Sequence, residues 1–274
     1  MFFGLFPRLT LSSGAIIRWH IVKNHLVWLG DNGKSAWRCL DVGCGRGEYV
    51  LEMARRFSSV QLVLGMDEMG RHSVGRFLPV PYNLRTRVRL MEAGFSPELA
   101  APHGTFDGAL CIDVLEHIDR DEGFLSGLAS VMSSEGRILI HVPARGQRHP
   151  LPGVWRKYLR QIEQGTDQHV REGYEREELV GLLRRAGWSV QTIQPTFGWC
   201  AAVWTDLDAT LAEAGSATMP LRIALLPLTI LGGWLSRYLR PRSGNGWLVL
   251  AERNPFAVSD QQQAPGSSIE RNKA

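Results

Sequence analysis

The stretch Cys39 to Phe57, CLDVGCGRGEYVLEMARRF, places the strongest constraint on the fold. Its first residues form a short apolar run that ends at Gly43, as expected of a buried strand. After the glycines, apolar residues recur at helical spacing, namely Tyr49, Val50, Met53, Ala54 and Phe57. A strand that breaks into glycines and becomes a helix is typical of a parallel sheet with crossover helices.

The same alternation continues along the chain. Further strands are predicted at 60–67, 87–94, 106–113, 136–143, 188–195 and 246–254. Helices are predicted at 115–132 and 174–187, and one more at 15–29 precedes the first strand. This order predicts an α/β fold with a doubly wound, mostly parallel sheet.

The chain of 274 residues is long enough for one catalytic-size domain with appendages. We assign 1–36 to an N-terminal helical segment, 37–253 to the main domain, and 254–274 to a polar tail expected to be disordered. Two stretches, 144–173 and 196–245, do not fit the alternation. Segments of this length outside the alternation are usually functional, so we interpret both as helical insertions that cover a site.

Composition excludes several classes of function. The net charge of +4 is mild, most basic residues are arginines, and no lysine-rich or aromatic-interleaved run indicates a nucleic-acid partner. The four cysteines form no C-x-x-C pair and no clustered metal-ligand pattern is visible, which favours a reduced, cytoplasmic protein without a metal. The N-terminus lacks a positively charged leader, which argues against secretion.

The glycine turn predicts a ligand site. In open parallel sheets, ligands bind outside the carboxyl ends of the strands, and Gly43 and Gly45 follow the first strand there. Asp41 ends the first strand and Asp67 ends the second, where an acid can accept hydrogen bonds from both ribose hydroxyls of an adenosine. The spacing is G-x-G-x-G and not G-x-G-x-x-G, which favours an adenosine cofactor without a pyrophosphate.

The chain resembles class I S-adenosylmethionine-dependent methyltransferases in four successive motifs, which read LDVGCGRGEY, VLGMDEM, FDGALCIDVLEHI and GRILIHVP. The VLEHI motif further resembles the branch of this family that methylates small molecules, lipids and sugars. The resemblance implies a Rossmann-like, seven-stranded sheet whose last strand runs antiparallel beside the fifth. It implies S-adenosylmethionine as cofactor, with the Gly43 to Gly47 loop along its methionine part, Asp41 at its amino group and Asp67 at its ribose. Members of this family often carry an acid after the third strand that binds adenine. In this chain the corresponding segment reads MEAGFSP, and either Glu92 or the backbone of 93–95 is expected to contact the adenine.

Methyl transfer mainly requires alignment of the acceptor and exclusion of water, but a hydroxyl acceptor gains from a general base. Asp113 follows the fourth strand and is a candidate at the methionine end of the cofactor, with helix capping as the alternative. His169 in the first cover is the candidate general base, with a surface role as the alternative. Packing is the favoured role for Glu116, His117 and His141; Arg171 and Tyr174 are weaker candidates to orient an acceptor.

The segment 220–242 is the most apolar part of the chain, but it is too short between its arginines to span a bilayer. Three interpretations stay open: a lid or acceptor-pocket wall, plain core or a subunit interface, and an interfacial anchor whose flanking arginines contact anionic headgroups.

The sequence therefore predicts a methyltransferase that acts on a small or lipid-like acceptor, with O-methylation as the preferred chemistry. We expect a cytoplasmic protein, with peripheral membrane contact through 220–242 left open, and the oligomeric state is not determined. Two alternatives are a dinucleotide-dependent oxidoreductase and a non-catalytic assembly partner that keeps the fold. The glycine spacing and VLEHI argue against the first, and the retained acids and glycines argue against the second.

Overall fold

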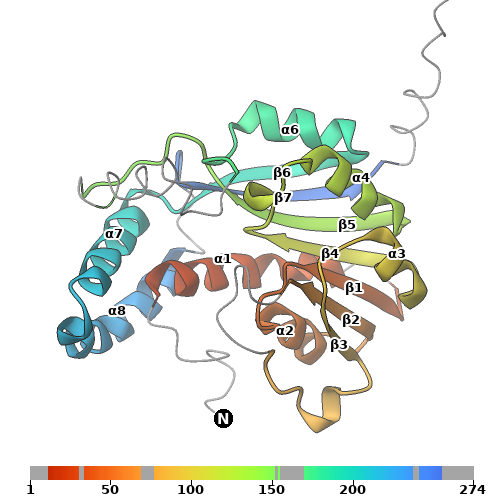
Figure 1. Ribbon diagram of the computed structural model, residues 1–274, viewed down its shortest axis with the longest axis horizontal. Coiled ribbons are helices and arrows are strands. Elements are labelled where there is room, and N and C mark those ends of the chain that lie inside the picture. The colour runs from red at the N-terminus through yellow and green to blue at the C-terminus, as the bar shows by residue number, and fades with distance from the viewer. Residues whose placement is uncertain are drawn as a thin grey trace, which may run out of the picture.

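A seven-stranded sheet forms the centre of the computed structural model (Figure 1), which describes residues 12–30, 34–68, 77–151, 154, 170–236 and 241–254. The strand order is β3-β2-β1-β4-β5-β7-β6. The strands are β1 (Trp37–Val42), β2 (Val60–Asp67), β3 (Val88–Glu92), β4 (Phe106–Ile112), β5 (Met132–Pro143), β6 (Trp188–Thr196) and β7 (Gly246–Arg253).

Pairing within the sheet confirms the predicted topology. The strands from β3 to β5 pair in parallel, and β7 is antiparallel to both β5 and β6. The inner strands β1 and β4 are buried along almost their whole length, because helices cover both faces of the sheet. The doubly wound, Rossmann-like fold expected from the sequence is therefore present.

Helices divide between the two faces of the sheet (Figure 1). One face is covered by α1 (Ser13–Gly30) and α2 (Glu48–Arg56), and the other by α3 (Pro97–Ala100), α4 (Asp121–Ser130) and α6 (Arg176–Arg185). The helix α6 begins with a capping box in which Glu175 and Glu178 bond each other's backbone N–H groups, which explains its sharp start.

One expectation about local structure needs correction. The predicted helix at 115–132 is divided into a 3-10 turn, Leu115–His117, and α4, and its last residue already belongs to β5. The stretch 196–245 is largely helical, as expected of a helical insertion, and forms α7 (Trp199–Glu213) and α8 (Met219–Ser236). Although Pro227 lies inside α8, packing of α8 against α1 and α7 maintains the helix.

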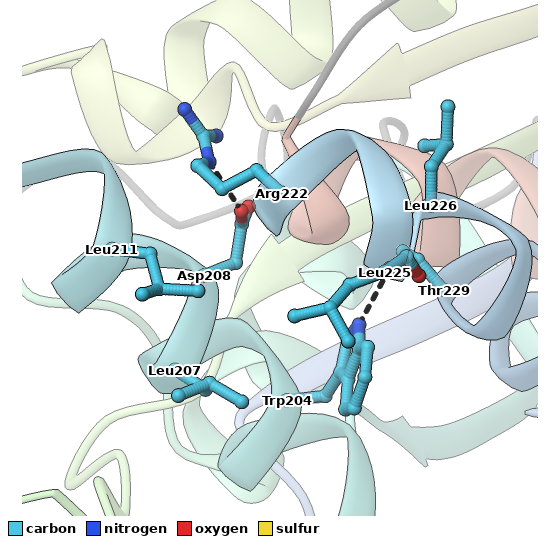
Figure 2. A pocket seen from close by; sticks show the side chains of 8 residues that line it. All are labelled: Trp204, Leu207, Asp208, Leu211, Arg222, Leu225, Leu226 and Thr229. Atoms are coloured by element: carbon cyan, nitrogen blue, oxygen red, sulfur yellow. Dashed lines mark hydrogen bonds and ion pairs between the residues drawn. The ribbon is translucent and has the colours of Figure 1, made fainter. Parts of the chain in front are cut away.

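The helices α1, α7 and α8 pack together at one side of the sheet, and we call them the helical cap (Figure 1). Asp208 on α7 accepts hydrogen bonds from the Ser13 backbone N–H of α1 and from Arg222 Nε of α8, both at 2.8 Å. Figure 2 shows the shallow pocket between α7 and α8, where the Trp204 indole also donates to Thr229 Oγ1 at 2.7 Å. Asp208 thus joins all three helices of the cap.

Candidate cofactor site

The glycine loop leaves β1 and is fastened to the end of β2. The N–H groups of Gly43 and Cys44 donate to Met66 O at 2.8 and 3.1 Å, and Gly45 N–H donates to Asp67 Oδ2 at 2.8 Å. One carboxylate oxygen of Asp67 therefore organises the loop. Asp67 stands where the sequence places the ribose acceptor, beside the loop predicted to follow the methionine part.

Gly43 and Gly45 both have positive φ, +67° and +54°, but their surroundings differ. A Cβ at Gly43 would collide with Val114 Cγ2, whereas a Cβ at Gly45 would meet no atom within 4 Å. Gly43 is thus required by internal packing, and Gly45 leaves an open backbone surface. An open backbone at the carboxyl edge of a parallel sheet allows close approach of a ligand.

Asp41 lies directly below this loop and is 1% exposed. Its Oδ2 atom has no hydrogen-bond partner among the residues that the structure describes. Burial, followed by the nearby Glu48 and Asp67 carboxylates, raises the pKa of Asp41 well above its ordinary value. A buried carboxylate with an unused acceptor and acidic neighbours is a site for a cationic or hydrogen-donating group of a ligand.

The third strand supplies the remaining predicted cofactor residue. Glu92 ends β3 in register with Asp67 and is exposed. Glu68, which the sequence did not single out, packs against Gly94 just beyond β3. The structure therefore places Glu92 at the same edge as Asp67, with Glu68 as a second acid near the MEAGFSP segment.

Asp113 follows β4 and joins three elements. One of its carboxylate oxygens pairs with Arg18 from α1, and the other lies 2.5 Å from His141 Nδ1 on β5. Burial alone would raise the pKa of Asp113, but Arg18 and then His141 outweigh burial and lower this pKa to about 2. Asp113 is thus a carboxylate at neutral pH, and its partner nitrogen on His141 must carry a proton.

His141 extends the Asp113 contact to β6. Its Nε2 lies 3.0 Å from Thr196 Oγ1, and both side chains are buried. Among the described residues other than glycine, the positive φ angles belong to Asp113 and Phe197, and both residues contact His141. Such backbone angles persist where surrounding contacts enforce them, often at functional sites.

Glu116 lies one turn beyond Asp113 and is 2% exposed. Burial, together with the Asp113 charge, raises the pKa of Glu116 well above its ordinary value. Its Oε2 atom has no hydrogen-bond partner within the described part of the chain. The edge therefore holds one strongly ionised acid, Asp113, next to one acid that is easily protonated.

Other residues from the sequence analysis have different outcomes. His169 lies outside the described residues. Arg171 pairs with Asp121, and the buried Tyr174 hydroxyl donates to Asp121 Oδ2 at 2.9 Å and to Leu115 O at 3.1 Å. These two side chains fasten the start of α4 instead of facing an acceptor.

Arg18 and Thr196 were missed as site residues. Arg18 is a charge inside the otherwise apolar run from Ile16 to Trp19, and this interruption was the available signal. Thr196 carried no signal, because its role depends on the pairing of β6 beside β7, which brings its hydroxyl to His141.

Comparisons with known proteins identify the family of the chain. The chain matches the family described as Methyltransferase domain over residues 20–193 and belongs to that family. It is 27% identical over 162 residues to a ubiquinone biosynthesis O-methyltransferase of Xanthomonas axonopodis, which covers 57% of this chain and 64% of the relative. It is 24% identical to a malonyl-[acyl-carrier protein] O-methyltransferase of Geobacter sulfurreducens, with 64% of each chain covered.

Solved structures give the same fold. An O-methyltransferase from a multienzyme of Brevibacillus brevis, in complex with S-adenosyl-L-homocysteine, superposes with a TM-score of 0.52 at 15% identity over 94% of this chain and 84% of its own. A cyclopropane synthase of Mycobacterium tuberculosis superposes with a TM-score of 0.51 at 18% identity, over 85% of this chain and 82% of its own. At these identities the likeness concerns the fold, and the chain spans 64% of the length of the two curated relatives.

Proposed function

We propose that the protein is an S-adenosylmethionine-dependent methyltransferase that methylates an oxygen atom of a small, lipid-like acceptor. The observation that carries this proposal is the combination of Asp41, Gly45 and Asp67 at one edge: a buried carboxylate with an unused oxygen, an open glycine backbone and an acid at the end of β2. Membership in the methyltransferase family disfavours the oxidoreductase alternative.

The residues fit the proposed cofactor. Asp41 offers an unpartnered oxygen to the amino group of the methionine part, and its ionised form is favoured when that cation is bound. Gly45 leaves room for the backbone to lie along the ligand, and the Asp67 carboxylate has acceptor sites for the ribose hydroxyls. Glu92 remains our candidate near the adenine. When bound, S-adenosylmethionine supplies an electrophilic methyl group on a sulfonium.

The chain's own residues then have to align the acceptor and exclude water. We assign Asp113 to orientation and not to proton removal, because a carboxylate with a pKa of about 2 is a weak base at neutral pH. Its contacts with Arg18 and His141 hold it in place. His169 remains the candidate base for a hydroxyl acceptor, since histidine can accept a proton near neutral pH.

An oxygen acceptor on a lipid-like molecule is supported by two observations. Both named relatives are O-methyltransferases, and one group of them acts in ubiquinone biosynthesis. In this chain, α7 begins just after Thr196 and leads into α8, so the apolar cap starts at the same edge of the sheet as Asp113 and His141. An apolar layer beside the site favours an acceptor with an apolar tail.

The test has two stages. Calorimetric titration with S-adenosylmethionine and with its demethylated product should show binding of both, and labelled methyl transfer to phenolic and lipid acceptors should then give product. His169→Ala should lower turnover with little change in cofactor affinity. If the protein binds neither cofactor form, the proposal is wrong, and a non-catalytic assembly role takes its place. Binding without transfer to any oxygen acceptor would exclude O-methylation.

A further inference from the structure

The outer side of α8 is apolar without interruption. The inner positions pack on α1 and α7, as shown by the buried Thr229 and by Gly233, where a Cβ would lie 2.9 Å from His20 and 3.5 Å from Ile17 Cα. The outer large side chains are 40% to 54% exposed, and they are Met219, Leu221, Ile223, Leu228, Leu231, Trp234 and Leu235. Surface helices of globular proteins normally present polar residues on this side.

This patch is concentrated on one helix. Seven of the twelve large hydrophobic side chains that are exposed among the described residues belong to α8. Ser216–Leu235 is long and apolar enough to cross a membrane by length and composition, with mean hydropathy 1.4, yet only 11% of it is buried. Buried core helices share this hydropathy, but α8 exposes the apolar surface that a core helix would hide.

The sequence from α8 to the start of β7 carries charge of one sign. Between Glu213 and Glu252 the sequence contains no acidic residue and four arginines, Arg222, Arg237, Arg240 and Arg242. Arg242 is exposed, and Arg222 is held by Asp208 at 2.8 Å. An exposed apolar face with Trp234 near its end and a basic sequence after it suits a membrane–water interface, where tryptophan is enriched and arginines attract anionic headgroups.

The helix lies flat against the protein instead of standing free. Its contacts with Ile16, Ile17 and His20 run along α1, and Asp208 ties Arg222 to α7. The uncharged run from Ile223 to Ser236 would extend about 21 Å as a helix, against a hydrocarbon core of about 30 Å. Both facts exclude a spanning arrangement that keeps this packing.

We propose that α8 docks the protein on an anionic lipid surface, with its outer apolar face in the interface and the basic sequence that follows it, which includes the exposed Arg242, attracting the headgroups. A second copy is a poorer occupant, because an isologous contact through this face would offer the basic sequence no acidic residue between Glu213 and Glu252 to pair with. The docking does not depend on the methyl acceptor, although it would place the neighbouring site edge near molecules dissolved in the membrane.

The test is vesicle sedimentation with the full chain. We expect binding to vesicles of phosphatidylcholine with phosphatidylglycerol, weaker binding to phosphatidylcholine alone, and further weakening by salt. The double variant Leu228→Gln, Leu231→Gln should reduce partitioning about tenfold or more, because it puts two amides in the apolar face. Leu99→Gln is the matched control, since Leu99 is 43% exposed on α3, and it should bind as the parent does.

Three results would overturn the proposal: absence of partitioning by the parent protein, unchanged partitioning of the double variant, or equal loss with Leu99→Gln. Light scattering separates the competing occupant. If the parent is a dimer that the double variant converts to monomers, and neither binds vesicles, the patch is a subunit interface. Cofactor titration is independent of vesicle binding. If the protein does not bind vesicles, the proposed methyltransferase activity can therefore still be tested on its own.

Discussion

The glycine-loop edge and the helical cap are built by different means. At the edge, the chain turns within a few residues, and backbone N–H groups bond Met66 O and the adjacent Asp67. In the cap, side chains connect segments far apart in sequence: Ser13 and Asp208 are separated by 195 positions, and Arg18 and Asp113 by 95. Backbone conformation defines the first region, and long-range side-chain pairing defines the second.

This difference has a functional consequence. The edge leaves a buried polar atom unsatisfied, Asp41 Oδ2, as the cofactor site that we propose requires. The cap pairs some polar groups between its helices, such as Asp208 with the Ser13 N–H and Trp204 with Thr229, and leaves an apolar outer side. Substitutions of the edge groups that we assign to the cofactor should therefore act mainly on ligand affinity, and those in the cap mainly on local stability.

Gly43→Ala and Gly45→Ala form a matched pair with the largest expected effects. Gly43→Ala should destabilise the fold by about 3 kcal/mol, from a left-handed backbone and a collision with Val114. Gly45→Ala should cost only about 1 kcal/mol, because its Cβ meets open space, but it should strongly weaken cofactor binding. Thermal unfolding and calorimetry check both, and equal destabilisation by the two variants would contradict the distinction.

Asp67→Ala should weaken cofactor binding by about 100-fold, corresponding to two ribose hydrogen bonds at about 1.5 kcal/mol each. The fold should remain, since little packing is removed. Asp67→Asn is the control for loop geometry, because its amide oxygen can still accept the Gly45 N–H. Titration with the demethylated cofactor measures both variants, and parent-like affinity of Asp67→Ala would remove Asp67 from the site.

The sequence predicted the glycine-loop edge much better than the helical cap, because local backbone conformation can be read from the chain and long-range side-chain pairing cannot. Asp41, Gly43, Gly45 and Asp67 stand at strand ends, where spacing along the chain fixes their position, and the structure brings them together. Arg18 and Thr196 act only after helix packing and strand pairing place them beside Asp113 and His141. The α7 and α8 helices were predicted only as a helical cover without bounds, because glycine and proline in 196–245 obscure where each helix begins and ends.

Asp208→Ala tests the cap as a separate unit. The variant removes two hydrogen-bond acceptors that join α1, α7 and α8, and we expect a local destabilisation of about 2 kcal/mol. Hydrogen exchange should accelerate in α7 and α8 but not in β1 or β4. Glu213→Ala, at the end of the same helix, is the control for removal of an α7 carboxylate. Uniform acceleration across the sheet would mean that the cap and the sheet unfold together.

The smallest expected effect concerns Asp113, where the two regions meet through Arg18. The folded pKa of Asp113 is about 2, below the ordinary value of 3.8, so the folded state binds its proton less readily than the unfolded state does. The resulting stabilisation is fully present above about pH 4 and is lost as pH falls through about 2. We expect this ionised carboxylate to add about 1 to 2 kcal/mol to the free energy of unfolding, because its partial exposure lets solvent screen the charge.

Asp113→Asn is the matched variant, since asparagine tolerates the positive φ of 53° at this position. Denaturant unfolding between pH 4 and pH 2 should show a shallower loss of stability than in the parent, because the titrating group is gone. Asp119→Asn replaces an exposed carboxylate nearby and serves as the control. If Asp113→Asn and the parent lose stability in parallel over this range, the Arg18 contact does not couple the cap to the edge, and the two regions are energetically independent.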